Sequence, residues 1–360
     1  MIGSFKKTNF IVAGLSYVGA FVGAGFISGQ ELVQFFIRFG VGGLIGWIAT
    51  VVTISVGGGK ILEALSRTRP ESFEEIVEKF FGIKITKLIT LIINGYLIGG
   101  LIIMLSGAGG VLAETANISP VFGVSIISLL IFLTIIGKAE RLLRVNQYLV
   151  PMLILSTLIT TTILFVKYAS NFDLGQNFTI KNPSPMLLNP VFSYFFYIGY
   201  NALGAFVALV NIAKKIQPDV GRRGGIFGGI IISILGSLLF TALWLTYPEW
   251  QEAELPIIFI LKRNFGLIYY LFLPSILIAM FTVATAYALG ISKYFFKKLN
   301  LGFNQTCLGL MLTITPIALL GFSRLIGMIY PFFGIMATLI LIYLIFKFLI
   351  KGGGKSAEYY

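Results

Sequence analysis

The fold of this chain is decided by residues 18–31, which read VGAFVGAGFISGQE. Four glycines fall within residues 19–29 of this apolar run, and each weakens a helix by about 1 kcal/mol relative to alanine. The apolar segment around it is also longer than one membrane crossing needs. We therefore expect a helix break near residues 23–29, which leaves backbone groups unpaired at mid-membrane. Such groups are tolerated only where they line a cavity or bind something.

A second segment, residues 192–205, has a similar character and reads FSYFFYIGYNALGA. If the chain consists of two five-span halves, Gly199, Asn201 and Gly204 occupy the position that corresponds to the first break. Interrupted segments at matching positions of two halves point to the binding site of a transporter. Glycines four residues apart also serve close helix packing. We favour packing for the pairs at residues 95/99, 224/228 and 225/229.

The composition indicates an integral membrane protein. Of the 360 residues, 57% are hydrophobic and 11% are charged, whereas a soluble domain has about 45–50% and about 25%. There is no histidine and one cysteine, Cys307, which excludes His-based catalysis, most zinc sites and an internal disulfide. Both aspartates, Asp173 and Asp219, lie outside the apolar runs. The membrane region therefore lacks the residues of a catalytic centre, and we expect no enzyme activity.

Apolar runs and charge predict an all-α polytopic fold with ten transmembrane helices. With the N-terminus in the cytoplasm, 21 Lys and Arg residues fall inside and 6 outside, as the positive-inside rule requires. Both termini are therefore expected in the cytoplasm of a multi-pass cell-membrane protein, and the net charge of +13 needs no nucleic-acid partner. No cleavage site of a signal peptide follows the first segment. The expected segments lie at about 8–39, 41–63, 86–113, 120–137, 147–167, 189–213, 225–247, 266–292, 304–321 and 324–349.

We expect one transmembrane domain at residues 1–350, followed by a cytoplasmic tail at 351–360. Its two repeats would cover about 8–167 and about 189–349. Between the second and third segments, Ser72 and Glu75 have the spacing of a capping box ahead of a short amphipathic helix on the cytoplasmic surface. The external loop 248–264 is half apolar, and it fits either a lid that dips inward or a plain surface hairpin.

Residues 23–36, GAGFISGQELVQFF, resemble the first helix of the YkvI-type family of bacterial membrane proteins. These are distant members of the amino acid–polyamine–organocation superfamily, which shares the LeuT fold. The resemblance implies a 5+5 inverted repeat, in which spans 1 and 6 are interrupted at the substrate, and a coupling ion, Na⁺ or H⁺. It implies substrate contacts at Gly23, Ala24, Gly25, Phe26, Ser28, Tyr197, Gly199, Tyr200 and Asn201. Tyr96, on the third span, is a further candidate that would cap the site.

The relatives also suggest where a coupling ion binds. Sodium-coupled members place hydroxyl residues on span 8, where this chain has Thr282 and Thr285 on one helix face. Together with backbone carbonyls near Gly23 they form a candidate sodium site. Some proton-coupled members use a lysine in span 5, and this chain has only Lys167 at the outer end of that span. This difference favours Na⁺.

Glu31 is the one acidic residue well inside a span, and a charge at mid-bilayer costs about 2.5–3.5 kcal/mol on insertion scales. Gln34 and Arg38 share its helix face, and with Gln30 they form the candidate gating or coupling group. Three hypotheses remain open. Glu31 is solvated in an external vestibule, contacts a substrate amine or coupling cation, or carries the coupling proton.

The sequence predicts a secondary active transporter of a small amino acid or related zwitterion, coupled to a cation in symport and working by alternating access. Partial positive charge at half-helix N-termini suits a carboxylate, and free carbonyls suit an amine or cation. The alternative is a ligand sensor that keeps the fold without moving the solute. Nothing resembles the filter or acidic ring of a channel. The expected partners are the small solute and the lipid bilayer, without a cofactor, nucleic acid or obligate protein partner.

Overall fold

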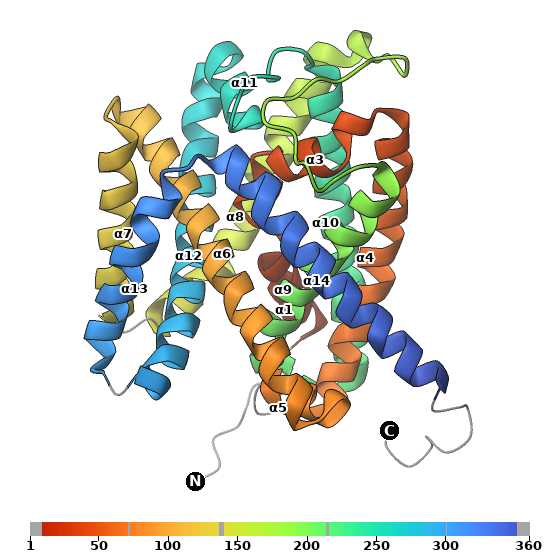
Figure 1. Cartoon of the computed structure of the whole chain (residues 1–360). Coiled ribbons are helices and arrows are strands. Elements are labelled where there is room, and N and C mark those ends of the chain that lie inside the picture. Colours follow the sequence, from red (N-terminus) through yellow and green to blue (C-terminus); the bar gives the residue numbers. More distant parts are fainter. Residues whose placement is uncertain (1–8, 71–72, 137–139, 214–215, 300, 351–360) are drawn as a thin grey trace.

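The computed structural model describes residues 9–70, 73–136, 140–213, 216–299 and 301–350, and this part of the chain contains helices and no strand (Figure 1). The helices up to residue 171 are α1 (Phe10–Phe21), α2 (Ala24–Ile27), α3 (Gln30–Phe35), η1 (Ile37–Phe39), α4 (Val41–Thr68), α5 (Phe73–Phe81), α6 (Ile83–Ala116), α7 (Pro120–Ile136), α8 (Glu140–Tyr168) and η2 (Ala169–Asn171). Those that follow are α9 (Pro190–Ala213), α10 (Pro218–Leu245), α11 (Pro256–Asn264), α12 (Gly266–Leu299), α13 (Phe303–Ala318) and α14 (Phe322–Ile350).

The lengths and composition of these helices are those of a multi-helix membrane protein. Within the described residues, six helices are long and apolar enough to cross a membrane: α4, α6, α8, α10, α12 and α14. Two more, α1 and α7, are apolar but shorter. The all-α membrane class is therefore as predicted, while the count of ten spans stays a prediction. In Figure 1, α3 and α11 lie at one end of the bundle and α5 lies at the other.

The first apolar segment is divided into three short helices. Asn9 caps α1 by accepting a hydrogen bond from the Ile11 N–H at 3.1 Å. α1 ends at Phe21, and Val22 is extended, with φ −80° and ψ 93°. α2 then adds about one turn, and Gly29 turns the chain into α3 at φ +82°, a conformation that favours glycine. Both non-helical stretches of backbone thus fall within the glycine-rich part of the segment, residues 22–29.

α9 differs from the prediction, because it runs without interruption from Pro190 to Ala213. Its glycines allow close packing instead of a break. A Cβ atom at Gly199 would lie 2.8 Å from the carbonyl oxygen of Gly334 on α14 and 2.8 Å from the Thr338 hydroxyl. The Asn201 Nδ2 donates to the carbonyl oxygen of Tyr197 at 3.0 Å, so this amide bonds its own helix. The expected interruption of the sixth segment was therefore wrong for this structure.

Glycines also allow α10 to pack tightly between α1 and α4. A Cβ atom at Gly228 would lie 2.5 Å from the carbonyl oxygen of Gly14, and one at Gly229 would lie 2.6 Å from Cα of Ser55. The same holds for Gly225, where a Cβ atom would lie 2.5 Å from the carbonyl carbon of Gly58. The packing role expected for these spaced glycines is confirmed.

We expect Gly225→Ala to destabilise the protein by about 1–3 kcal/mol, the usual effect of overpacking, because the obstructing atoms belong to a neighbouring backbone. The measurement is the thermal unfolding midpoint in one detergent. Gly57→Ala is the matched control, since a Cβ atom there has nothing within 4 Å and alanine favours helix. Equal midpoints for the two variants would contradict a tight seam between α10 and α4.

The loop after α10 folds inward as a lid and is not a plain hairpin. It contains α11, whose Ile257, Ile258, Ile260 and Leu261 are buried. The Ile257 N–H donates to the carbonyl oxygen of Ser28, between α2 and α3, at 3.1 Å. At the other end of α11, Lys262 Nζ lies 2.8 Å from Glu114 Oε1, and this hydrogen bond raises the pKa of Lys262. The lid therefore connects the break to α6.

Several predicted features fall at the edges of the described ranges. α5 occupies Phe73–Phe81, so the short helix between the second and third segments is confirmed. Ser72 of the expected capping box and the tail at 351–360 lie outside the described residues. The proposed repeat boundaries stay predictions.

A candidate ligand pocket at the break

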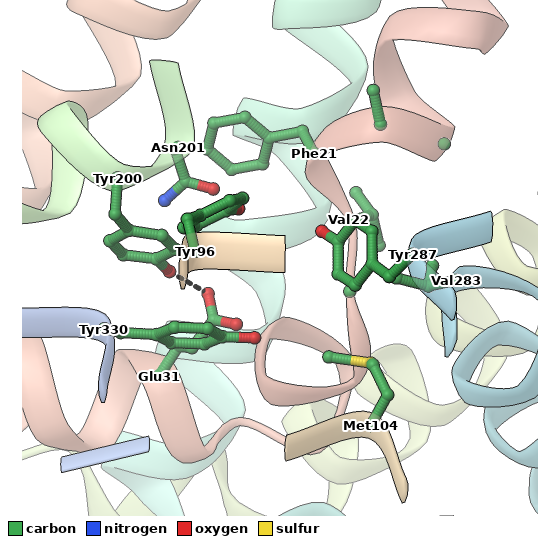
Figure 2. Close-up of a pocket in the computed structure, with 13 residues that line it drawn as sticks. Phe21, Val22, Glu31, Tyr96, Met104, Tyr200, Asn201, Val283, Tyr287 and Tyr330 are labelled. Atoms are coloured by element: carbon green, nitrogen blue, oxygen red, sulfur yellow. Dashed lines mark hydrogen bonds between the residues drawn. The ribbon is translucent and has the colours of Figure 1, made fainter. Parts of the chain in front are cut away.

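A small pocket lies where the broken first segment meets α6, α9, α12 and α14 (Figure 2). Its volume is about 20 Å³, which is room for about one or two water molecules. A larger solute therefore requires the lining side chains to move. The lining residues are Gly19, Ala20, Phe21, Val22, Gly23, Glu31, Tyr96, Met104, Tyr200, Asn201, Val283, Tyr287 and Tyr330.

Glu31 provides the single carboxyl group of this lining. Its side chain is 2% exposed, and Oε2 accepts a hydrogen bond from the Tyr200 hydroxyl at 2.5 Å (Figure 2). The backbone of Phe26 makes a further hydrogen bond with the carboxyl group. No Lys or Arg nitrogen in the described ranges forms an ion pair with it. The hypothesis of a solvated Glu31 is therefore wrong, because the carboxyl group is enclosed by protein.

Gly25 gives Glu31 the space for this position. A Cβ atom at residue 25 would lie 2.8 Å from Glu31 Cγ and 2.9 Å from Cδ. Only glycine allows the carboxyl group to lie directly over the backbone at the start of α2. The glycine-rich stretch therefore has a second effect besides weakening the helix, because it brings a carboxyl group against exposed main chain.

Four tyrosines surround the pocket beside Glu31. Tyr200 and Tyr330 stack with ring centroids 4.6 Å apart and an interplanar angle of 11°. Tyr96 and Tyr287 meet edge to face, with centroids 6.3 Å apart. Figure 2 shows the four rings around the carboxyl group, with Met104 below them. We call Tyr96, Tyr200, Tyr287 and Tyr330 the tyrosine cage.

Backbone acceptors complete the polar part of the pocket. The lining residues Gly19, Ala20 and Phe21 form the last turn of α1, and the last carbonyls of a helix have no partner within it. This end of a helix also carries partial negative charge. Asn201 uses its Nδ2 on Tyr197, which leaves its amide oxygen as an acceptor.

The structure brings together only part of the predicted substrate residues. Gly23, Tyr96, Tyr200 and Asn201 line the pocket, and Gly25 lies under Glu31. The side chain of Ala24 is outside the described residues.

The other predicted substrate residues do not line the pocket. Phe26 and Tyr197 are fully buried in an aromatic cluster around Phe21. The Ser28 hydroxyl donates to the Gly25 carbonyl at 3.2 Å, and Gly199 packs on α14.

The expected gating residues contact other elements rather than Glu31. Gln30 Nε2 donates to the Ser323 hydroxyl on α14 at 2.6 Å. Gln34 Nε2 donates to the carbonyl oxygen of Asn182 at 3.0 Å and its Oε1 accepts from the Ser184 N–H at 3.1 Å. Arg38 donates to the carbonyl oxygen of Ser184 at 3.1 Å. Gln34 and Arg38 therefore join the loop at residues 182–184 to the end of the broken segment.

The residues of the candidate sodium site are not gathered around this pocket. Gly23 lines it, whereas Thr282 and Thr285 do not. The Thr282 hydroxyl donates to the Ala279 carbonyl at 3.0 Å, and the Thr285 hydroxyl donates to the Phe281 carbonyl at 2.8 Å. Both side chains are buried. Each hydroxyl retains a lone pair, so the site stays a prediction.

Sequence reasoning missed two members of the tyrosine cage, Tyr287 and Tyr330. Both lie in long apolar helices that contain other aromatic residues, and no local motif sets them apart. A usable signal was the presence of tyrosine hydroxyl groups within these apolar helices, since a buried hydroxyl group needs a polar partner.

Comparisons with known proteins agree on a transporter fold. No protein-family profile matches the chain. The uncharacterised membrane protein YkvI of Bacillus subtilis (strain 168) is 27% identical over 339 residues, which are 92% of each chain. The structure of MhsT in complex with L-phenylalanine superposes with a TM-score of 0.65 at 14% identity, covering 93% of this chain and 88% of that one. A Na⁺-coupled sialic acid symporter in a substrate-bound outward-open state gives 0.59 at 15% identity, covering 97% and 75%.

The relative and the solved structures each cover more than nine tenths of this chain. This protein is therefore similar over most of its length to the membrane protein YkvI, and its fold is of the LeuT type.

Proposed function

We propose that this protein is a secondary active transporter of a small solute that carries an amino group, an amino acid or related zwitterion being the expected class. The observation that carries the proposal is the Glu31 carboxyl group, enclosed at the break of the first segment without a described cationic partner. An intramembrane ionisable residue is by default functional. A positively charged amine is the natural partner for it.

The fold supports transport rather than catalysis. The structural neighbours include a symporter and a protein bound to L-phenylalanine, and both solutes are small molecules. We propose ten spans in a 5+5 inverted repeat, within one domain at residues 1–350. The contacts between the first segment and α9, and between α4 and α10, pair the elements that correspond in such a repeat. Alternating access then moves one group of helices against the other around the pocket.

Coupling to a cation is part of the proposal. Thr282, Thr285 and the Gly23 carbonyl are the candidate ligands of Na⁺, and Glu31 is the candidate carrier of H⁺. Gln30, Gln34 and Arg38 fit a gate, because each joins the broken segment to an element on the external side. Breaking these hydrogen bonds would open the external side of the pocket.

The sensor remains the second candidate. It has the same pocket and the same ligand contacts, and it differs only in the absence of movement across the membrane. The volume of about 20 Å³ shows that binding must rearrange the pocket, and a rearrangement of this kind serves signalling as well as transport.

Reconstitution in liposomes distinguishes the transporter from the sensor. The purified protein is placed in liposomes, and uptake of radiolabelled L-leucine, L-phenylalanine and phenethylamine is followed with and without a Na⁺ or a proton gradient. Accumulation driven by one gradient supports the transporter. Binding without uptake supports the sensor, and the absence of both contradicts the two functions together. A thermal-shift screen of amino acids with and without Na⁺ extends the set of solutes.

The proposed orientation has its own test. We expect a cysteine at residue 252, on the loop that carries α11, to react with an impermeant maleimide added to intact cells. A cysteine at residue 219, at the start of α10, should react only after the cells are opened. Both residues are at helix ends or in loops, and Cys307 is buried. The opposite labelling pattern would reverse the orientation.

A further inference from the structure

The charges around the pocket are of one sign. Glu31 provides the carboxyl group, and none of the residues that the structure places in the lining is Lys or Arg. The last turn of α1 adds carbonyl oxygens and partial negative charge. An amine therefore meets acceptors on several sides, whereas a ligand carboxylate meets no cation.

The Glu31 carboxyl group occupies the position that the sequence predicts for a ligand carboxylate. A ligand carboxylate was expected at the backbone where the helix restarts after the break. α2 is four residues long, and the carboxyl group of Glu31 itself lies over Gly25 and bonds the Phe26 backbone. A second carboxylate there would meet the first, and like charges in a buried site exclude a ligand strongly.

The remaining walls suit one ammonium group with an apolar body. The tyrosine cage offers ring faces, which attract a cation most when water is excluded. Val22, Met104 and Val283 provide the apolar surface. The Glu31 carboxylate has further lone pairs besides the one that Tyr200 uses, and a second ammonium group would find no second carboxylate.

The geometry points to a small monoamine with an apolar body, bound as a cation and without a carboxylate, as the ligand of this pocket. This rests on the proposed function and narrows it, because it replaces the zwitterion by an amine and also excludes a diamine. The amine lies between Glu31 and the carbonyls of the α1 end, and Met104 and the cage rings move to admit the apolar body.

Matched pairs of ligands test the inference by isothermal titration of the purified full-length protein. Phenethylamine is compared with L-phenylalanine, 3-methylbutylamine with L-leucine, and butylamine with putrescine. The first two pairs differ in one carboxylate, and the third differs in a second ammonium group. We expect the monoamine to have at least a tenfold lower Kd in each pair, which corresponds to a difference in binding free energy of about 1.4 kcal/mol.

Variants locate the binding. Glu31→Gln should weaken phenethylamine binding by at least tenfold, whereas Glu252→Gln, the same change at an exposed position, should leave it unchanged. If Glu31→Gln loses binding because it does not fold, its thermal midpoint also falls. The readout is then the thermal midpoint of the unmodified protein, which phenethylamine should raise.

The outcomes separate this inference from the proposed function. Tighter binding of L-phenylalanine and L-leucine than of their amines, with Glu31-dependent uptake, overturns the monoamine and keeps the transporter. Tighter binding of putrescine than of butylamine overturns the single-ammonium site. Binding of monoamines without uptake keeps the inference and favours the sensor. No binding by any of the six compounds overturns the inference, and uptake of another solute would then leave the transporter standing.

Discussion

Gly25→Ala is expected to lower ligand affinity by at least tenfold while the protein stays folded. The new Cβ atom would lie 2.8 Å from Glu31 Cγ, so the carboxyl group must leave its place beside Tyr200. Because Glu31 is buried, it has no solvent-exposed position to take instead. The backbone at residue 25 does not have positive φ, so alanine is not strained there. The measurement is the Kd of the tightest-binding compound among the matched pairs.

Gly23→Ala is the matched control for that variant. It lies at the same break, and its Cβ atom would meet only Met104 Cε, at an ordinary 3.6 Å. Size-exclusion profiles and thermal midpoints should match the unmodified protein for both variants. Equal affinities of the two variants would show that the position of Glu31 over Gly25 has no part in binding.

Glu31→Gln is expected to reduce accumulation in proteoliposomes to background without lowering the thermal midpoint. Glutamine has the same shape and accepts the Tyr200 hydrogen bond, and unlike glutamate it cannot ionise in this buried position. Burial of an uncompensated ion costs several kcal/mol, so stability should be retained or increased. Uptake at a series of pH values, beside the midpoint, is the measurement, and Glu252→Gln is the control.

The remaining exchange activity of Glu31→Gln distinguishes the two open roles of this residue. If Glu31 carries the coupling proton, the variant still exchanges solute across the membrane, and its exchange rate no longer depends on pH. If Glu31 binds the amine, affinity falls at every pH. Accumulation equal to that of the unmodified protein would contradict both roles.

Local sequence predicted the first segment well, because its structure depends on intrinsic helix propensity. Gly23 and Gly29 lie in the two interruptions of the helix, and the apolar run lengths indicated the membrane class. α9 shows the limit of this reasoning. Gly199 resembles a helix breaker in the sequence, but its neighbour on α14, Gly334, makes it a packing residue. That neighbour is far away in the chain, so glycine content alone could not separate the two roles.

The candidate site was predictable only where one local segment defines it. Gly23, Gly25 and Glu31 all belong to the motif at residues 18–31, and the structure places them at one pocket. Tyr287 and Tyr330 come from helices near the other end of the chain, and their hydroxyl groups face Glu31 only because of the tertiary arrangement. The same holds for Gln34 and Arg38, whose partner loop at residues 182–184 was not foreseen.

Through the hydrogen bond from α11 to Ser28, an exposed residue of α11 can report on movement at the buried break. A shift of α3 against α2 must stretch the bond between the Ile257 N–H and the Ser28 carbonyl, so α11 is displaced with it. Phe259, on the same helix, is 38% exposed. A fluorophore attached at residue 259 would therefore change its emission when the buried break rearranges, and the rate of that change would give the opening frequency of a pocket that no dye can enter.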